Sequence, residues 1–312
     1  MILAGGNMQR VLNASILGIS GRQSELIELA LTFGFRGLDI EIDELRKRVQ
    51  SQGFEQARRF LESAKLTVSS FEVPCRYDAR DAQSGDDRLE LEDRFRIGAA
   101  MGASRCYTTV LPASDELPYH QNFEFHRRKL RELAEMAAGH GMQLGVGFLA
   151  AASHRKERAF QFIYQPDQLM MLIKTTGAAN IGIVLDTWNW YVGGGNLDLI
   201  LQLRTNEITA IRLADLPAEF DPAVIDESQR LVPGDGGVVD TPAILNHLVE
   251  MEYTGPIAVH VGPSAFQGLG VAGPGRDAMV QRIAKALDES FQAAGLTRGG
   301  KRLPSKAPAN AS

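Results

Sequence analysis

Residues 181–196 read IGIVLDTWNWYVGGGN, an apolar run that ends on an acid, Asp186, and continues into aromatic residues and three glycines. Short apolar runs bounded by turn residues are typical of strands that are buried on both faces. Seven other apolar or β-branched runs have the same character. They lie at 10–19, 35–42, 66–73, 104–111, 142–149, 208–215 and 256–261.

Segments with helical periodicity separate these runs, at 24–34, 92–102, 125–141, 165–177, 241–251 and 279–295. Several of them end on glycine, which favours a left-handed C-cap before the next strand: Gly34, Gly102, Gly141 and Gly177. Eight strands that alternate with helices predict a closed (β/α)8 TIM barrel of the α/β class. An open dinucleotide-binding sheet is less favoured, because no GxGxxG motif follows the first run.

The whole chain of 312 residues fits one barrel domain, which we expect to span 1–296. The last stretch, TRGGKRLPSKAPANAS at 297–312, is basic and has little to bury, so we expect a disordered tail. A net charge of −5 argues against nucleic acid and anionic membranes as partners and favours a small-molecule ligand. Two isolated cysteines, Cys75 and Cys106, and the lack of a long apolar run predict a cytoplasmic protein.

Side chains at the carboxyl ends of barrel strands converge on one mouth, where the functional groups of such barrels lie. The later strands end at Gly147, at Asp186, at Arg212 with Asp215, and at His260. Trp188, Asn189 and Trp190 follow Asp186 closely, and Arg230 lies in the long insertion after Asp215. We expect these residues to surround a ligand.

The stretch from Gly141 to Pro263 resembles the xylose isomerase-like family of sugar phosphate isomerases and epimerases, TIM barrels related to endonuclease IV. The resemblance is carried by GMQLGVGFL, IGIVLDTWNWYVGGGN, ITAIRLADLP, RLVPGDGGVVD and YTGPIAVHV. It implies a xylose isomerase-like barrel and a polyhydroxy substrate. Repair of DNA in the manner of endonuclease IV is not expected, because the six histidines are too few at the strand ends for a trinuclear zinc site.

The resemblance also implies a divalent metal held by a glutamate, an aspartate, a histidine and a second glutamate at the ends of strands five to eight. These four positions fall at Gly147, Asp186, Arg212 and His260, so the aspartate alone is kept. A histidine that contacts substrate in the family falls at Asn189.

A divalent ion such as Mn, Mg, Co or Zn needs several lone-pair donors, whereas Arg212 offers a positive charge and no lone pair. We therefore expect no metal cofactor unless Glu41, Glu72 or Asp235 supplies substitute ligands. The site would instead favour an anion.

Asp186 and His260 are the candidate catalytic pair. Arg212 should pair with Asp186 or Asp215 or hold an anionic ligand, and Asp186 is its expected partner. One of the two tryptophans is expected to stack on a sugar ring. The candidate ligand-binding residues are Asn189, Arg212, Trp188, Trp190, Asp215 and Arg230.

Two functions remain open from the sequence. The first is a pseudoenzyme with a degenerate metal site, a metal-free binder of a sugar, sugar acid or sugar phosphate. The second is an active isomerase, epimerase or lyase that acts on a polyhydroxy substrate with His260 and Asp186 as acid and base. Either function implies a small polyhydroxy or anionic ligand, and a homo-oligomer is compatible with both.

Overall fold

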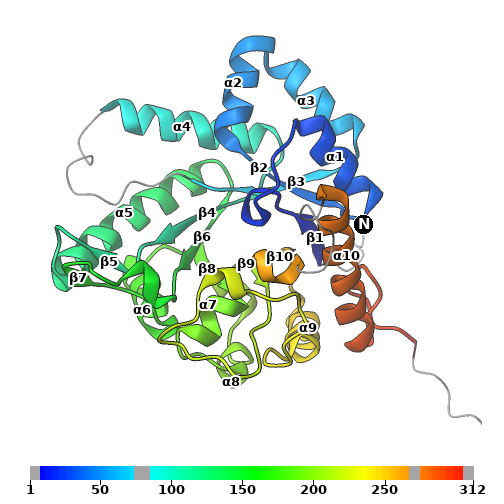
Figure 1. The fold of residues 1–312 in the computed structure, drawn as a ribbon. Coiled ribbons are helices and arrows are strands. Elements are labelled where there is room, and N and C mark those ends of the chain that lie inside the picture. Colours follow the sequence, from blue (N-terminus) through cyan, green and yellow to red (C-terminus); the bar gives the residue numbers. More distant parts are fainter. Residues whose placement is uncertain (1–7, 74–84, 267–274, 305–312) are drawn as a thin grey trace, which may run out of the picture.

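The structure is a computed structural model and describes residues 8–73, 85–266 and 275–304 (Figure 1). Parallel strands form a central sheet in the order β3-β2-β1-β10-β9-β8-β6-β4. In chain order they are β1 Gln9–Leu12, β2 Gly37–Ile40, β3 Thr67–Phe71, β4 Arg105–Val110, β6 Gln143–Phe148, β8 Ile181–Asp186, β9 Ile208–Leu213 and β10 Pro256–Val259.

A bridge between Glu72 and Tyr107 joins the two ends of this sheet, and the Val73 N–H donates to the Tyr107 carbonyl at 2.7 Å. The sheet therefore closes into a barrel. This confirms the (β/α)8 prediction, and every strand of the barrel overlaps one of the eight runs predicted to form strands. A small antiparallel pair, β5 Ala113–Ser114 and β7 Phe160–Gln161, lies apart from the barrel (Figure 1).

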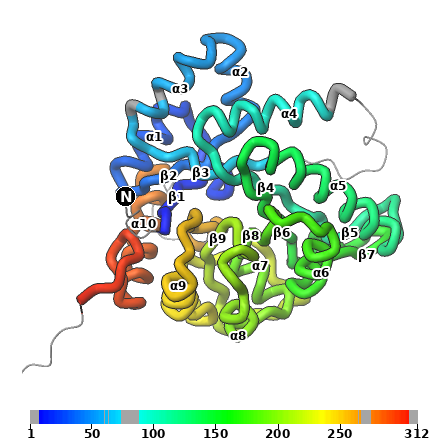
Figure 2. Tube along the Cα trace, turned by 180° about the vertical axis from the view of Figure 1, so that it is seen from behind, coloured from blue at the N-terminus to red at the C-terminus, as the bar shows by residue number. Residues whose placement is uncertain are grey.

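Helices surround the strands, as the views from both sides show (Figures 1 and 2). They are α1 Gln23–Thr32, α2 Ile42–Gln52, α3 Phe54–Ser63, α4 Gly85–Ala100, α5 Tyr119–Gly139, α6 Pro166–Thr176, α7 Thr187–Val192, α8 Leu197–Ile200, α9 Thr241–Glu250 and α10 Arg276–Ala293. The six helical segments predicted from periodicity overlap α1, α4, α5, α6, α9 and α10. The four glycines predicted to end helices all have positive φ, between 70° and 92°.

Four helices were not predicted from the sequence: α2, α3, α7 and α8. Helix α2 reads IDELRKRVQSQ and buries only Ile42 and Leu45, so its apolar stripe is too thin to be recognised. Helix α7 is a single aromatic turn whose start is fixed by the Asp186 carboxylate, which accepts from the Asn189 N–H.

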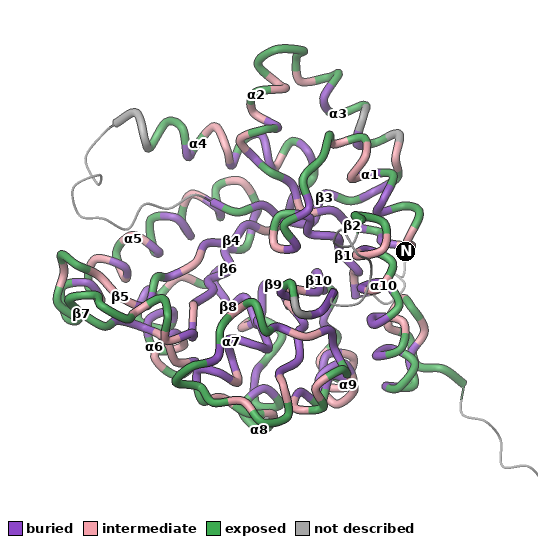
Figure 3. The backbone as a smooth tube through the Cα atoms, viewed as in Figure 1, coloured by how far each residue is buried: buried purple, intermediate pink, exposed green. Residues whose placement is uncertain are grey.

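The main core lies between the strands and the helices, where buried positions follow the strands and the inner helix faces (Figure 3). Inside the barrel, Tyr107, Val184 and Ala210 form a second, small cluster. Because side chains alternate along a strand, the next inward positions toward the carboxyl ends of β8 and β9 are Asp186 and Arg212. These two residues are register partners, so the barrel places them side by side at its mouth.

The segment predicted to be disordered is ordered at its start. The Thr297 N–H donates to the Lys301 carbonyl, the Leu303 N–H donates to Gly295, and Arg302 pairs with Glu250 at 3.2 Å. Residues 305–312 lie outside the described part of the chain, as does Cys75, so the domain boundary at 296 stays a prediction. Cys106 is a buried free thiol. None of the described helices is long and apolar enough to cross a bilayer.

Candidate functional site at the barrel mouth

The strand ends bring the predicted site positions together. Arg212 on β9 is paired in register with Asp186 on one side and with Ala258 of β10 on the other. His260 follows β10 directly, and its N–H donates to the Leu213 carbonyl at 2.9 Å. These contacts fix Asp186, Arg212 and His260 at one level of the barrel.

The Asp186 carboxylate accepts four hydrogen bonds. Nη1 of Arg230 donates to both of its carboxylate oxygens at 2.9 Å, Nδ1 of His260 donates at 2.8 Å, and the Asn189 N–H donates at 3.0 Å. Burial opposes ionisation of this carboxyl, but the Arg230 charge and the His260 hydrogen bond outweigh burial and hold the pKa of Asp186 well below its usual range. Asp186 is therefore a fixed anion and is poorly suited to accept a proton.

The predicted partner of Asp186 was wrong. Its ion pair is with Arg230, 44 residues further along the chain, and not with its register neighbour Arg212. Arg230 lies on the long loop after β9. Its guanidinium lies over the Trp188 ring, 4.5 Å from the ring centroid. Its Nη2 lies 3.5 Å from Glu227. The arginine, 1% exposed, is thus the centre of a buried ion cluster.

His260 is oriented by this cluster. A carboxylate accepts hydrogen bonds but cannot donate them, so the proton of the neutral imidazole must lie on Nδ1 and leave a lone pair on Nε2. Burial, together with the charges of Arg230 and Arg212, lowers the pKa of His260 although Asp186 acts in the opposite direction. The imidazole is therefore neutral near pH 7. Within the described residues its Nε2 makes no hydrogen bond, so it can accept a proton or a ligand hydroxyl.

Arg212 has a different environment. Its guanidinium lies over the Tyr107 ring, 4.5 Å from the centroid, and it has no hydrogen bond or ion pair to any residue in the described ranges. The tyrosine hydroxyl accepts from Nδ2 of Asn13 at 3.1 Å, and the same amide donates to Asp39 at 2.8 Å. The Ser70 hydroxyl donates to the other oxygen of Asp39 at 2.6 Å. The N–H donors of Arg212 therefore remain available to a ligand.

A cavity of about 340 Å³ is lined in part by Tyr107, whose ring Arg212 covers, although Arg212 itself is not one of the lining residues. Burial raises the pKa of Asp39 to about 6, against the hydrogen bond from Ser70 and the charge of Arg212. Burial also raises the pKa of Glu72, which Arg212 opposes and Glu41 reinforces. The polar residues that line the cavity are Asn13, Asp39, Glu41, Asp43, Glu72, Tyr107, Thr108 and Thr109.

Sequence reasoning missed Tyr107, Asp39 and Asn13 as site residues. Asp39 had a usable signal, since it is an acid in the second half of the predicted run 35–42, and residues near the carboxyl end of a barrel strand can face the mouth. Tyr107 had none, because nothing local shows that an arginine from β9 will cover its ring.

The two tryptophans and Asn189 pack within the loop around α7. Trp188 is fully buried beneath Arg230, and Trp190 is buried with its Nε1 donating to the Asn196 carbonyl at 3.0 Å. Asn189 is also buried, and its side-chain oxygen accepts from the Ala150 N–H at 2.9 Å. The ligand contacts expected of these three residues stay predictions.

Asp215 is likewise a structural carboxylate. It is fully buried and accepts from five backbone N–H groups at 2.8–3.1 Å, those of Leu216, Gly236, Gly237, Val238 and Val239. Its lone pairs are used to hold the VPGDGG turn in place. The structure thus gives Asp215 a role in holding this turn, and its role in ligand binding stays a prediction.

The donor set does not fit a divalent metal. Gly147 offers no donor, Arg212 is a cation, and both oxygens of Asp186 are already engaged. No group of three or more His, Cys, Asp or Glu residues in the described ranges is arranged to hold a metal ion. Of the predicted substitutes, Asp235 pairs with Arg282, while Glu41 and Glu72 line the cavity.

Residues 27–289 match the family described as xylose isomerase-like TIM barrel. The chain belongs to this family. It is 25% identical over 262 residues to 3-dehydroshikimate dehydratase of Pseudomonas aeruginosa, which covers 83% of this chain but only 39% of that protein. It is 20% identical over 223 residues to inosose isomerase of Halalkalibacterium halodurans, which covers 70% of this chain and 75% of the isomerase.

Among solved structures, the chain resembles the IOLI protein with a bound zinc atom, at a TM-score of 0.74 and 16% identity over 92% of this chain and 98% of that one. The two curated relatives are thus named as a dehydratase and an isomerase, and the IOLI structure is described with a bound zinc atom.

Proposed function

We propose that this protein binds a sugar, sugar acid or sugar phosphate at the barrel mouth without a resident divalent metal. The observation that carries the proposal is the bonding of Asp186, whose two oxygens are taken by Arg230 and His260. The Arg230 guanidinium already provides the positive charge that a bound metal ion would provide next to this carboxylate. A metal would have to displace a buried ion pair, which costs several kcal/mol.

The ligand chemistry follows from the groups that remain available. Arg212 is the cation with open N–H donors, and guanidinium groups bind carboxylates and phosphates with paired hydrogen bonds. The acids Asp39, Glu41 and Glu72 line the adjoining cavity and can accept hydrogen bonds from hydroxyl groups. The names of the two curated relatives, which refer to 3-dehydroshikimate and inosose, support a small polyhydroxy ligand.

The test is calorimetric titration of gluconate, glucose 6-phosphate and glucose into dialysed protein, with and without EDTA, alongside elemental analysis. We expect less than stoichiometric Mn, Mg, Co and Zn, and binding that EDTA leaves unchanged. Arg212→Gln should weaken gluconate binding by about tenfold or more. Arg204→Gln is the matched control, because Arg204 is 75% exposed and pairs with Glu207. One ion retained per chain, or gluconate binding indifferent to Arg212→Gln, would overturn the proposal.

A second candidate function is favoured by the Asp186–His260 hydrogen bond. In that arrangement Nε2 of His260 is the base, Arg212 polarises a substrate carbonyl, and Asp186 orients the imidazole without transferring a proton. This differs from the acid–base pair predicted from the sequence. Isomerase, epimerase or lyase turnover of keto sugars or inososes should be lost in His260→Ala, and turnover that survives this change excludes the assignment.

A further inference from the structure

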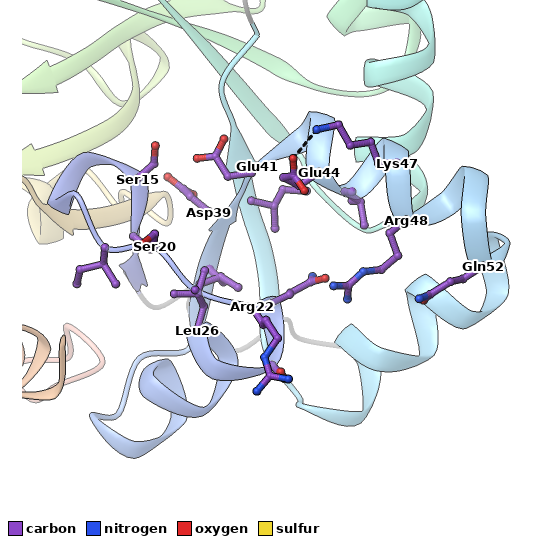
Figure 4. A pocket seen from close by; sticks show the side chains of 18 of the residues that line it. Ser15, Ser20, Arg22, Leu26, Asp39, Glu41, Glu44, Lys47, Arg48 and Gln52 are labelled. Atoms are coloured by element: carbon purple, nitrogen blue, oxygen red, sulfur yellow. Dashed lines mark hydrogen bonds and ion pairs between the residues drawn. The ribbon is translucent and has the colours of Figure 1, made fainter.

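A second and larger cleft lies beside the mouth. It has a volume of about 1200 Å³ and opens between the segment from Ser15 to Leu26 and helix α2 (Figure 4). Asp39, Ile40 and Glu41, at the end of β2, line both this cleft and the mouth cavity. The two spaces therefore adjoin along the carboxyl end of one strand.

The two spaces differ in volume. Pockets for drug-sized ligands have volumes of about 300–1000 Å³. The mouth cavity, about 340 Å³, is at the low end of that range and suits a single sugar ring. The adjoining cleft, about 1200 Å³, has room for at least one more ring-sized group.

The cleft lining is both apolar and hydrogen-bonding. Leu38, Leu45 and Ile19 are buried side chains that form its apolar wall. Short hydroxyl and amide side chains complete the lining: Ser15, Ser20, Ser24, Ser51, Gln23, Gln52 and Gln56. Such a surface suits a ring that has apolar faces and polar edges.

The charges of the cleft are balanced. Three carboxylates and three cations line it: Asp39, Glu41, Glu44, Arg22, Lys47 and Arg48. Lys47 and Glu44 pair with each other at 2.6 Å, as Figure 4 shows. Asp39 and Glu41 lie at the barrel end of the cleft, whereas Arg48 and Gln52 lie on α2 at the outer end. A lining without net charge gives an anionic or cationic group no advantage, so it favours a neutral one.

We propose that the ligand carries a neutral, ring-sized substituent, as a glycoside does, and that this substituent lies in the cleft between α2 and the segment from Ser15 to Leu26. The inference rests on the proposed function for the ring that is held at the mouth. The proposed ligand is then a glycoside of a sugar or sugar acid, and not a free monosaccharide.

Two matched pairs of probes test this. Gluconate is compared with cellobionate, which adds a sugar ring, and glucuronate is compared with phenyl β-D-glucuronide, which adds an apolar ring. We expect at least one extended ligand to bind about tenfold or more tightly than its small partner in calorimetric titration. The pair that shows the gain identifies the substituent as a sugar or an apolar group.

Variants that fill the cleft test whether the tighter binding of the extended ligand depends on the cleft. Ser20→Trp and Gln52→Trp enlarge exposed residues on opposite walls, so folding should survive in both. Each should abolish the gain of the extended ligand and leave binding of the small partner within about twofold. Ser104→Trp is the matched control, because Ser104 is exposed and precedes β4 at the opposite end of the barrel.

The outcomes separate the two proposals. If gluconate binds through Arg212 but neither extended ligand binds more tightly, the cleft inference is overturned and the mouth proposal stands. A gain that both cleft-filling variants leave intact also overturns it. If the extended ligands bind, are blocked by Ser20→Trp and are indifferent to Arg212→Gln, the cleft is supported as a site and the mouth proposal fails.

Discussion

Replacing Arg230 by methionine should strongly destabilise the fold, because it leaves the Asp186 carboxylate buried without its main counter-charge. Arg230 is 1% exposed, and its Nη1 makes two hydrogen bonds of 2.9 Å to Asp186. Hydrogen bonds to charged groups contribute about 1.5–3 kcal/mol each, and removing one partner of a buried ion pair costs about 3–5 kcal/mol. We therefore expect Arg230→Met to lose about 3–5 kcal/mol of unfolding free energy at pH 8.

The loss should shrink as the pH falls. In the wild-type protein burial, Arg230 and Arg212 lower the pKa of His260, whereas Asp186 raises it. Without Arg230 one cause of this lowering is removed, so the folded-state pKa of His260 moves up toward its unfolded value of about 6.5. A lowered histidine pKa costs stability as the pH falls below the unfolded pKa, and this cost is smaller in the variant than in the wild-type protein. The loss at pH 5.5 should therefore be smaller than the loss at pH 8, by up to about 1.4 kcal/mol.

Urea unfolding followed by circular dichroism at the two pH values measures both effects. The double variant Arg230→Met with Asp186→Leu should be more stable at pH 8 than Arg230→Met, since it leaves no unpaired charge. Arg204→Met, at an exposed pair, should change stability by less than about 0.5 kcal/mol. A loss below about 1 kcal/mol for Arg230→Met, or a loss that is the same at both pH values, would refute this account of the cluster.

Three further predictions concern stability and the metal site. Asp215→Asn replaces one accepting oxygen by an NH₂ group that faces backbone N–H donors. The free energy of unfolding, measured in urea, should therefore fall by about 2–4 kcal/mol. A fall of less than about 0.5 kcal/mol would mean that the carboxylate does not hold its loop. Burial lowers the pKa of His126 to about 4, so near pH 4.5 this histidine is protonated mainly in the unfolded state. Between pH 7 and pH 4.5 the wild-type protein should therefore lose about 2–3 kcal/mol more unfolding free energy than His126→Phe. Urea titrations in which the two proteins give parallel curves of stability against pH would contradict this prediction. A Cβ at Gly147 would have its nearest neighbour at 3.6 Å, so the site has room for a glutamate there. Gly147→Glu, Arg212→His and His260→Glu, combined with Arg230→Met to free the Asp186 oxygens, should create a Mn²⁺ site measurable by calorimetry. The triple variant that keeps Arg230 is the control, and a quadruple variant that folds but binds no Mn²⁺ would argue against these positions as the former ligand set.

The barrel could be predicted because its strands are buried on both faces. Such strands read as continuous apolar runs, as IGIVLD does before Asp186, and their alternation with helices leaves few topologies. Helix α2 was missed for the opposite reason, since it is highly charged and only Ile42 and Leu45 among its residues are buried. The hydrophobic periodicity of a segment reflects how large a face of it is buried, so a mostly exposed helix has only a weak periodic pattern.

The sequence by itself determined which positions reach the barrel mouth, because strand ends follow from the apolar runs. That Gly147, Arg212 and His260 stand where the family holds a metal is implied by the resemblance alone. Only the tertiary structure decided the partners. Asp186 binds Arg230 because a long loop after β9 returns over the mouth, and Arg212 turns instead to Tyr107 on β4. The path of a loop and the direction of a long side chain depend on packing between distant segments, which no local pattern encodes.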